Sequence, residues 1–281
     1  MAHENVFHKF LHHPIASFAM AVLLAEVLLL LLLPGLLHLD YTAMDKVNFY
    51  QAPNASFWLG TDETGRDMLA RFLEGGRVTL FIGLSATAIS VLIGLPLGLI
   101  AGYFRGFSET LIMRMADMFL SFPLMVIILV VVAVFGATIP MIVLLIGFLH
   151  WPAITKLIYG NVLSVSSMEY VQAERAIGTG KWKILFGTVL PNAMTPLWVA
   201  LAFRVSSAMM TESALSFLGA GVQSPEASWG SLIQSASSLA VITQRWWLWI
   251  PASLALVITV VCVNFVGEGL RDALDTKMNS H

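Results

Sequence analysis

The sequence contains little charge and almost no cysteine. Asp, Glu, Lys and Arg make up 11% of its 281 residues, whereas soluble domains contain about a quarter of such residues. The net charge of -2 offers no basic surface for nucleic acid, so no nucleic-acid partner is expected. Cys262 is the one cysteine, which excludes an internal disulfide and suits core packing. With a hydrophobic content of 58%, these deficits predict an all-α polytopic membrane protein.

Short motifs for catalysis or metal binding are also missing. The sequence has no H-E-x-x-H, no G-x-S-x-G and no paired cysteines. The run Gly178-Thr179-Gly180-Lys181 fails the phosphate-loop pattern, because Arg175 replaces the first glycine and Trp182 replaces the Ser or Thr. We therefore expect no catalytic residue, no metal and no bound cofactor in this chain, and a partner must supply energy.

Long apolar runs predict six transmembrane helices. Their expected ranges are 15–37, 78–103, 116–136, 137–159, 192–218 and 247–267. The first run exceeds a signal-peptide core and has no clear cleavage site, so it is expected to be retained. The expected organisation is a flexible N-terminal segment 1–14, a loop 38–77, a core transmembrane domain 78–268 that contains a connection at 159–191, and a tail 269–281.

Charged residues inside these runs are candidates for function, since charge is costly in lipid. Asp117, Arg204 and Glu212 are assigned translocation or structural roles, and Glu26 is expected to face protein. Arg204 and Glu212 are eight residues apart, about 12 Å along a helix, so each should have another partner. A proton or metal site at His150, and metal binding by the N-terminal histidines, are open alternatives to plain packing and a flexible interfacial segment. These histidines are His3, His8, His12 and His13.

Residues 166–191, called the elbow below, form the longest polar interruption in the second half. Ser166 and Glu169 fit a capping box, and Gly178 is placed for a left-handed helix end. Thr179 could cap a second helix that stops at Pro191. The predicted apolar faces contain Tyr170, Ala173 and Ile177 in the first helix, and Trp182, Leu185, Phe186 and Val189 in the second. Such an elbow suits a groove on another protein, although an ordinary amphipathic loop is the alternative.

The elbow also resembles a known motif. The order Gln172-Ala173-Glu174, Gly178 and Leu190-Pro191 is similar to the EAA loop of ABC importer permeases, with Gln-Ala-Glu in place of the usual Glu-Ala-Ala. In that family the loop forms the coupling helix that docks on the ATP-hydrolysing subunit. The resemblance implies ATPase contacts from Tyr170, Gln172, Ala173, Glu174, Ala176, Gly178, Leu190 and Pro191.

A second block precedes the second span. The string GTDETGRDMLARFLEGGRVTL, residues 60–80, resembles a segment of the peptide and nickel branch of these permeases. Its acids and arginines can pair with one another and cap the next helix, whereas ligand binding by Arg66 or Asp67 is the alternative. The motif residues are Asp62, Gly65, Arg66, Asp67, Arg71 and Arg77. The runs 212–219, 221–225, 228–230 and 267–275 also resemble the family.

This resemblance implies a permease subunit with the type I ABC importer fold. Its expected partners are a second homologous permease, two ATPase subunits that hold ATP and Mg, an extracytoplasmic binding protein and the lipid bilayer. The path, lined by spans two to five, would carry di- or oligopeptides by alternating access, with nickel or a metal chelate as the alternative cargo. An ion-coupled secondary transporter is the alternative class, but it would need its own ion site and internal repeats.

Basic residues are distributed unequally between the two sides that six spans create. Nine lie on the side of the termini and elbow: Lys9, Arg105, Arg114, Lys156, Arg175, Lys181, Lys183, Arg271 and Lys277. Five lie on the other side: Lys46, Arg66, Arg71, Arg77 and Arg245. The positive-inside rule therefore predicts both termini and the elbow in the cytoplasm. The resemblance implies that the membrane is the inner membrane of a bacterium.

Overall fold

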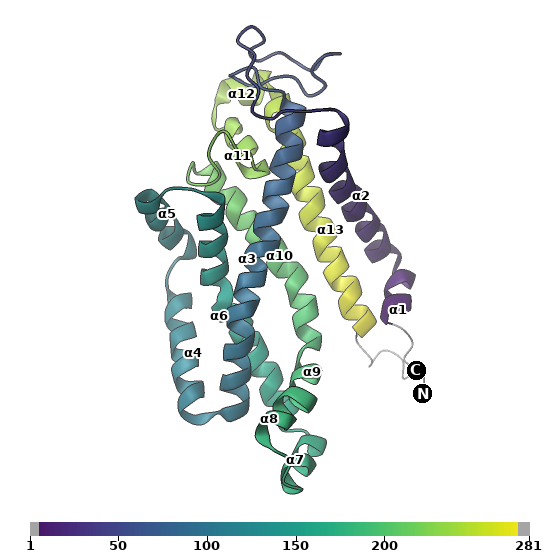
Figure 1. Cartoon of the computed structure of the whole chain (residues 1–281), viewed down its shortest axis with the longest axis vertical. Helices are drawn as coiled ribbons and strands as arrows, with labels where there is room; N and C mark the ends of the chain where they lie inside the picture. Colours follow the sequence, from purple (N-terminus) through teal and green to yellow (C-terminus); the bar gives the residue numbers. More distant parts are fainter. Residues whose placement is uncertain (1–5, 275–281) are drawn as a thin grey trace.

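The computed structural model describes residues 6–274, which form a bundle of long helices (Figure 1). The helices are α1 (Val6–His12), α2 (Pro14–Leu36), α3 (Met68–Phe104), α4 (Gly106–Ser121), α5 (Leu124–Phe135), α6 (Ile139–Ser166), α7 (Glu169–Ala176), α8 (Lys181–Ile184), α9 (Leu190–Ala193), α10 (Thr195–Phe217), α11 (Trp229–Gln234), α12 (Leu239–Gln244) and α13 (Ile250–Leu274). A π-helical turn, Leu185–Val189, joins α8 to α9. No strand occurs within residues 6–274, and the predicted all-α class is confirmed.

Four segments of the described chain are long and apolar enough to cross a membrane by themselves. They are α2, α3, α6 and the segment Trp246–Leu274. Two bent pairs pass the same test together: α4 with α5, at 78°, and Lys181–Ala193 with α10, at 55°. Counting each bent pair as one span gives the six predicted spans.

Several predicted boundaries were wrong in the first half of the chain. The second span begins at Met68 rather than at 78, because Asp67 accepts a hydrogen bond from the amide of Leu69 and caps α3. The expected loop 104–115 is helical after a tight turn at Arg105. The third span is not continuous, since Phe122 and Pro123 separate α4 from α5, and proline cannot donate the bond of a continuing helix.

The ends of the chain are also more helical than predicted. Residues 6–12 form α1 instead of a flexible segment, and α13 continues through the expected tail as far as Leu274. His13 caps α2 and lies 3.4 Å from Asp272, so the start of α2 lies beside the end of α13. The expected tail beyond residue 274, and His3, lie outside the described residues.

The contact between α3 and α6 is the closest helix pairing in the bundle. Gly94, Gly98 and Gly102 lie one turn apart on α3 and face the side chains of Ile154, Ile158 and Val162. A Cβ atom at these glycines would lie 2.7, 2.7 and 2.8 Å from those side chains, so only glycine allows this approach. Small residues thus let the two backbones pack directly, as their presence in the second span predicted.

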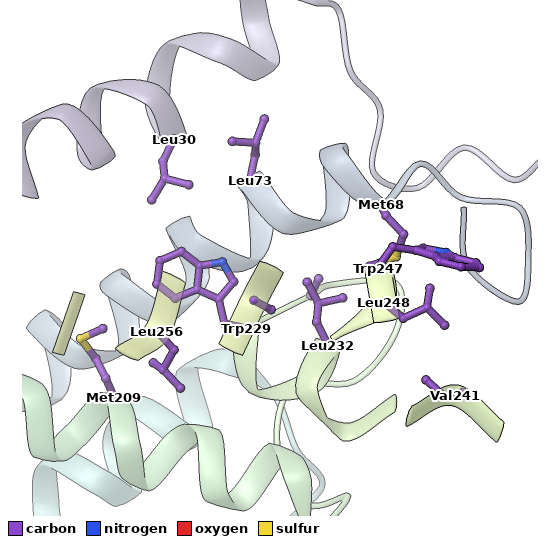
Figure 2. Packing of buried hydrophobic residues seen from close by; sticks show 12 residues of the cluster. Leu30, Met68, Leu73, Met209, Trp229, Leu232, Val241, Trp247, Leu248 and Leu256 are labelled. Atoms are coloured by element: carbon purple, nitrogen blue, oxygen red, sulfur yellow. The ribbon is translucent and has the colours of Figure 1, made fainter. Parts of the chain in front are cut away.

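Glu212 joins α10 to α11 through a buried polar cluster. Its carboxylate accepts hydrogen bonds from the hydroxyls of Ser216 and Ser228, both at 2.6 Å. Ser228 caps α11, and the next residue, Trp229, donates its amide to the hydroxyl of Thr79 on α3. Figure 2 shows the buried Trp229 ring among Leu30, Leu73, Met209 and Leu256, so four helices meet around it.

Gly98→Ala is expected to destabilise the bundle. The added methyl would lie 2.8 Å from the carbonyl oxygen of Thr155, a backbone atom that cannot move aside, and overpacking of this kind costs about 1–3 kcal/mol. Gly160→Ala on α6 is the matched control, because a Cβ atom there meets nothing within 4 Å. Thermal unfolding of the purified protein should show a lower Tm for the first variant alone. Equal Tm values would contradict the packing argument.

Glu212→Leu is expected to destabilise the protein more than Glu212→Gln. Leucine leaves two buried hydroxyls without an acceptor, at about 1–3 kcal/mol each, whereas glutamine keeps a carbonyl oxygen. Thermal unfolding and the yield of assembled complex measure the difference. Wild-type stability and assembly of the leucine variant would show that the carboxylate is incidental.

Candidate functional site: the helical elbow

The elbow projects beyond the ends of α3 and α4, at the end of the bundle opposite the loop 37–67 (Figure 1). α1 and the last turn of α13 lie toward this same end. The elbow consists of two limbs, α7 and the stretch from α8 to α9, joined at Ile177 to Gly180.

The first limb is shorter than predicted. Ser166 belongs to α6 and is buried, so the predicted capping box was wrong, and Met168 stands at the N-cap without a side-chain bond. The other end was predicted correctly. Gly178 has φ 81°, and the amides of Gly178 and Thr179 donate to the carbonyls of Arg175 and Glu174, which is the Schellman pattern.

The second limb begins at Gly180, not at Thr179, and it does not stop at Pro191. The π-helical turn precedes Pro191, and the helical path continues through α9 to a bend of 55° before α10. A wider turn at this point accommodates a residue that lacks an N–H. Ile184, Leu185 and Val189 are buried against residues of α3 and α6, so this limb is anchored in the bundle.

Three polar contacts connect the elbow internally and to the bundle. The hydroxyl of Thr188 donates to both carboxylate oxygens of Glu174, at 2.9 and 3.0 Å, and so links the two limbs. The Gln172 amide donates to the carbonyl of Ser166 at 3.0 Å. The Arg175 guanidinium lies 5.3 Å from the centre of the Tyr103 ring at the end of α3. Gln172 and Glu174, the two residues that depart from the usual Glu-Ala-Ala triplet, therefore contact residues of this same chain.

The outer surface of the elbow exposes large apolar side chains among charged ones. Val171 is the residue of α7 that packs inward, so the predicted face with Tyr170, Ala173 and Ile177 points outward. Trp182 and Phe186, which were predicted on the apolar face of the second limb, are also exposed, and their rings are stacked. Ala176 and Pro191 are exposed, whereas Leu190 is half-buried. An exposed patch of large apolar side chains is typical of an interaction surface.

The motif residues of the loop satisfy one another at the opposite end. Asp62 pairs with Arg66 at 2.8 Å and lies 3.6 Å from Arg71. Burial raises the pKa of Asp62, but hydrogen bonds from Thr64 and Arg66 outweigh burial and hold the pKa below its ordinary value. Arg66 also donates to Ser224 at 2.8 Å. This arrangement favours a structural role for the cluster over ligand binding.

The remaining motif residues also have local functions. Gly65 has φ 77°, a conformation suited to glycine, and its backbone packs against Asp45. Arg77 donates to the carbonyl oxygens of Leu30 and Leu31 on α2, at 2.7 and 2.9 Å. Arg77 also lies 3.4 Å from Glu74.

The predicted intramembrane charges do not form one site. Glu212 is in the buried cluster described above, and Glu26 accepts a hydrogen bond from Thr259 at 2.5 Å. Asp117 pairs with Lys156 at 2.5 Å, a partner that spacing did not reveal because it lies on another helix. His150 donates to the carbonyl of Ile146 at 2.6 Å. Among residues 6–274, no three His, Cys, Asp or Glu side chains gather as metal ligands.

Comparison with known proteins agrees with this architecture. Residues 94–280 match the family model described as "Binding-protein-dependent transport system inner membrane component". Similar curated proteins include the glutathione transport system permease protein GsiD of Pectobacterium atrosepticum, with 36% identity over 86% of this chain and 79% of that protein. The di/tripeptide transport system permease protein DppC of Pseudomonas aeruginosa has 38% identity over 83% of this chain and 76% of that protein. The oligopeptide transport system permease protein OppC of Bacillus subtilis has 32% identity over 96% of this chain and 88% of that protein.

A solved structure shares the fold. A chain of the MetNI methionine ABC transporter in an inward-facing conformation has a TM-score of 0.61 and 18% identity, over 74% of this chain and 98% of that chain. At this identity the likeness establishes the fold alone, which is that of a type I importer permease. The family match and the identities to curated relatives go further: the chain belongs to the family of inner-membrane permease components of binding-protein-dependent transport systems.

Proposed function

We propose that this chain is a permease subunit of an ABC importer for di- or oligopeptides. With a second homologous permease it would enclose the path, two ATPase subunits would hold ATP and Mg, and an extracytoplasmic binding protein would deliver the cargo. The elbow is anchored in the bundle and exposes large apolar side chains. This observation supports the proposal that a partner subunit moves this chain through the elbow. Peptide-permease names among the relatives support peptide cargo and do not favour nickel.

We infer the orientation from the position of the elbow. The elbow, α1 and the end of α13 lie toward one end of the bundle, which we place in the cytoplasm of a bacterial inner membrane (Figure 1). Lys156 drops out of the charge count, since it lies inside α6 rather than beyond it. The excess of basic residues at the elbow end remains, at eight to five, and supports this orientation.

The elbow would act as a lever with two states. When the ATPase subunits close on ATP, they would move the exposed surface of α7, and nucleotide would thereby bias the conformation of the bundle. The Glu174–Thr188 contact links the limbs, and buried Ile184, Leu185 and Val189 transfer the displacement to α3 and α6. The bend before α10 is the point at which the displacement reaches the fifth span. The residues of this chain carry out no chemistry in such a cycle.

Ile177→Asp is expected to weaken association with the ATPase subunits. Ile177 is 80% exposed on the elbow, and a carboxylate would have to be desolvated at an apolar interface, at a cost of about 1–3 kcal/mol or roughly tenfold or more in affinity. Leu239→Asp is the matched control, because Leu239 is 75% exposed at the opposite end. Quantitative co-purification measures the association. Equal retention of the ATPase by both variants would argue against docking at the elbow.

Gly178→Pro is expected to uncouple transport from ATP hydrolysis. Proline cannot adopt φ 81° and cannot donate the bond to Arg175, so the junction of the limbs must distort at a cost of about 3 kcal/mol. Gly180→Ala is the control, since Gly180 has φ -61° and open space around it. Uptake per ATP hydrolysed in reconstituted vesicles should fall at least about tenfold in the proline variant alone. Normal uptake by that variant would count against the lever.

A further inference from the structure

Arg204 is a charged residue deep in α10 without a counterion. It lies nine residues from Thr195 and thirteen from Phe217, so about 14 and 20 Å from the two ends of the helix. It is partly exposed, and it makes no hydrogen bond or ion pair with any residue in the described range 6–274. A cation at this depth is costly unless it meets an anion or water, so it cannot face lipid alone.

The face of α10 that carries Arg204 does not resemble a lipid-facing surface. Partly exposed residues recur along it at intervals of four and three, and all but Arg204 are small: Ala200, Arg204, Ser207, Thr211 and Ala214, with the exposed Phe203 and Met210 on its flank. The exposed face of α2 instead carries bulky apolar residues, namely Leu24, Leu28, Leu31 and Leu32. A narrow polar stripe at membrane depth is tolerated where it borders a water-filled passage or another protein.

The direction of this face follows from the neighbours of α10. Ala202 and Ser206 face α13, where they meet Gly267 and the carbonyl of Val260. Arg204 lies on a different side, one turn after Leu201, which packs with Leu197 in the apolar cluster that contains Ile154 and Ile158 of α6. The stripe therefore borders α6 and does not face α13.

A second charged group lies at a similar depth but is already neutralised. Lys156 of α6 and Asp117 of α4 form an ion pair, with side chains 42% and 55% exposed. They lie ten residues from Ser166 and eleven from Gly106, so about 15 and 16 Å inside the ends of their own helices. This pair has no net charge. Arg204 therefore gives this layer one uncompensated positive charge.

We propose that Arg204 binds the C-terminal carboxylate of peptide cargo during its passage, an inference that rests on the proposed function. A guanidinium binds a carboxylate through two parallel hydrogen bonds. Every unmodified peptide carries this carboxylate whatever its side chains, so one arginine provides contact that is independent of sequence. Partial exposure keeps the contact weak enough for release, which conduction through a membrane path requires.

The test compares uptake of a dipeptide and its C-terminal amide by the complete transporter with its binding protein. The binding protein is common to all variants, so a change in the ratio of the two uptake rates arises in the permease. Arg204→Gln should lower uptake of the free dipeptide about tenfold or more, from the loss of a charge-assisted bond, and leave amide uptake unchanged. Arg204→Lys should restore part of the free-dipeptide uptake. Arg204→Glu should raise uptake of the amide relative to the free dipeptide, because the only charge on the amide is the positive charge of its N-terminus.

A control and the contrary outcomes complete the test. The double variant Asp117→Asn, Lys156→Gln removes charge at the same depth without net change and should keep the wild-type ratio. Equal loss of both peptides in Arg204→Gln, with loss of the second permease on purification, would assign the anion to that permease and overturn the proposal. A wild-type ratio in Arg204→Gln and Arg204→Glu would also overturn it and leave the proposed function intact. Failure of the wild-type complex to take up any peptide would instead reject the proposed function.

Discussion

The close approach of α3 and α6 determines where the other helices can lie. Three glycines bring the two backbones together, and the apolar cluster that begins at this contact extends to Ile184, Leu185 and Val189 of the elbow. A displacement of the elbow therefore acts first on the most tightly packed pair in the described bundle. Packed cores tend to switch between discrete arrangements rather than deform continuously, which suits a permease that alternates between two states.

The elbow is packed against the bundle on its inner side and exposes large apolar side chains on its outer side. Two of its polar side chains are used internally, since Glu174 contacts Thr188 and Gln172 contacts Ser166. Its outer surface combines large apolar side chains, chiefly Tyr170, Ile177 and Trp182, with the exposed Lys181 and Lys183. A partner at this surface would be held both by burial of apolar area and by ion pairs with these lysines, so part of the attachment would depend on ionic strength.

The sequence predicted those features that depend on local periodicity or on one residue's backbone. Apolar runs located six spans, and the left-handed conformation of Gly178 followed from its position after a short amphipathic helix. Features set by contacts between distant residues were missed. Ser166 resembled a cap because the pattern is local, but packing of α6 continues the helix past it. Lys156, the partner of Asp117, and Ser228, one partner of Glu212, belong to other helices, and spacing along the chain cannot identify such pairs.

The contact of Arg77 with α2 satisfies a backbone carbonyl that has no donor within its own helix. Pro34 has no N–H, so the carbonyl of Leu30, four residues earlier, lacks its usual partner within the helix. The guanidinium of Arg77 supplies the missing donor from α3. The family model begins at residue 94, so α2 lies outside the matched segment. This peripheral helix is thus attached at a point where a proline leaves a backbone carbonyl free and an arginine of α3 supplies the donor.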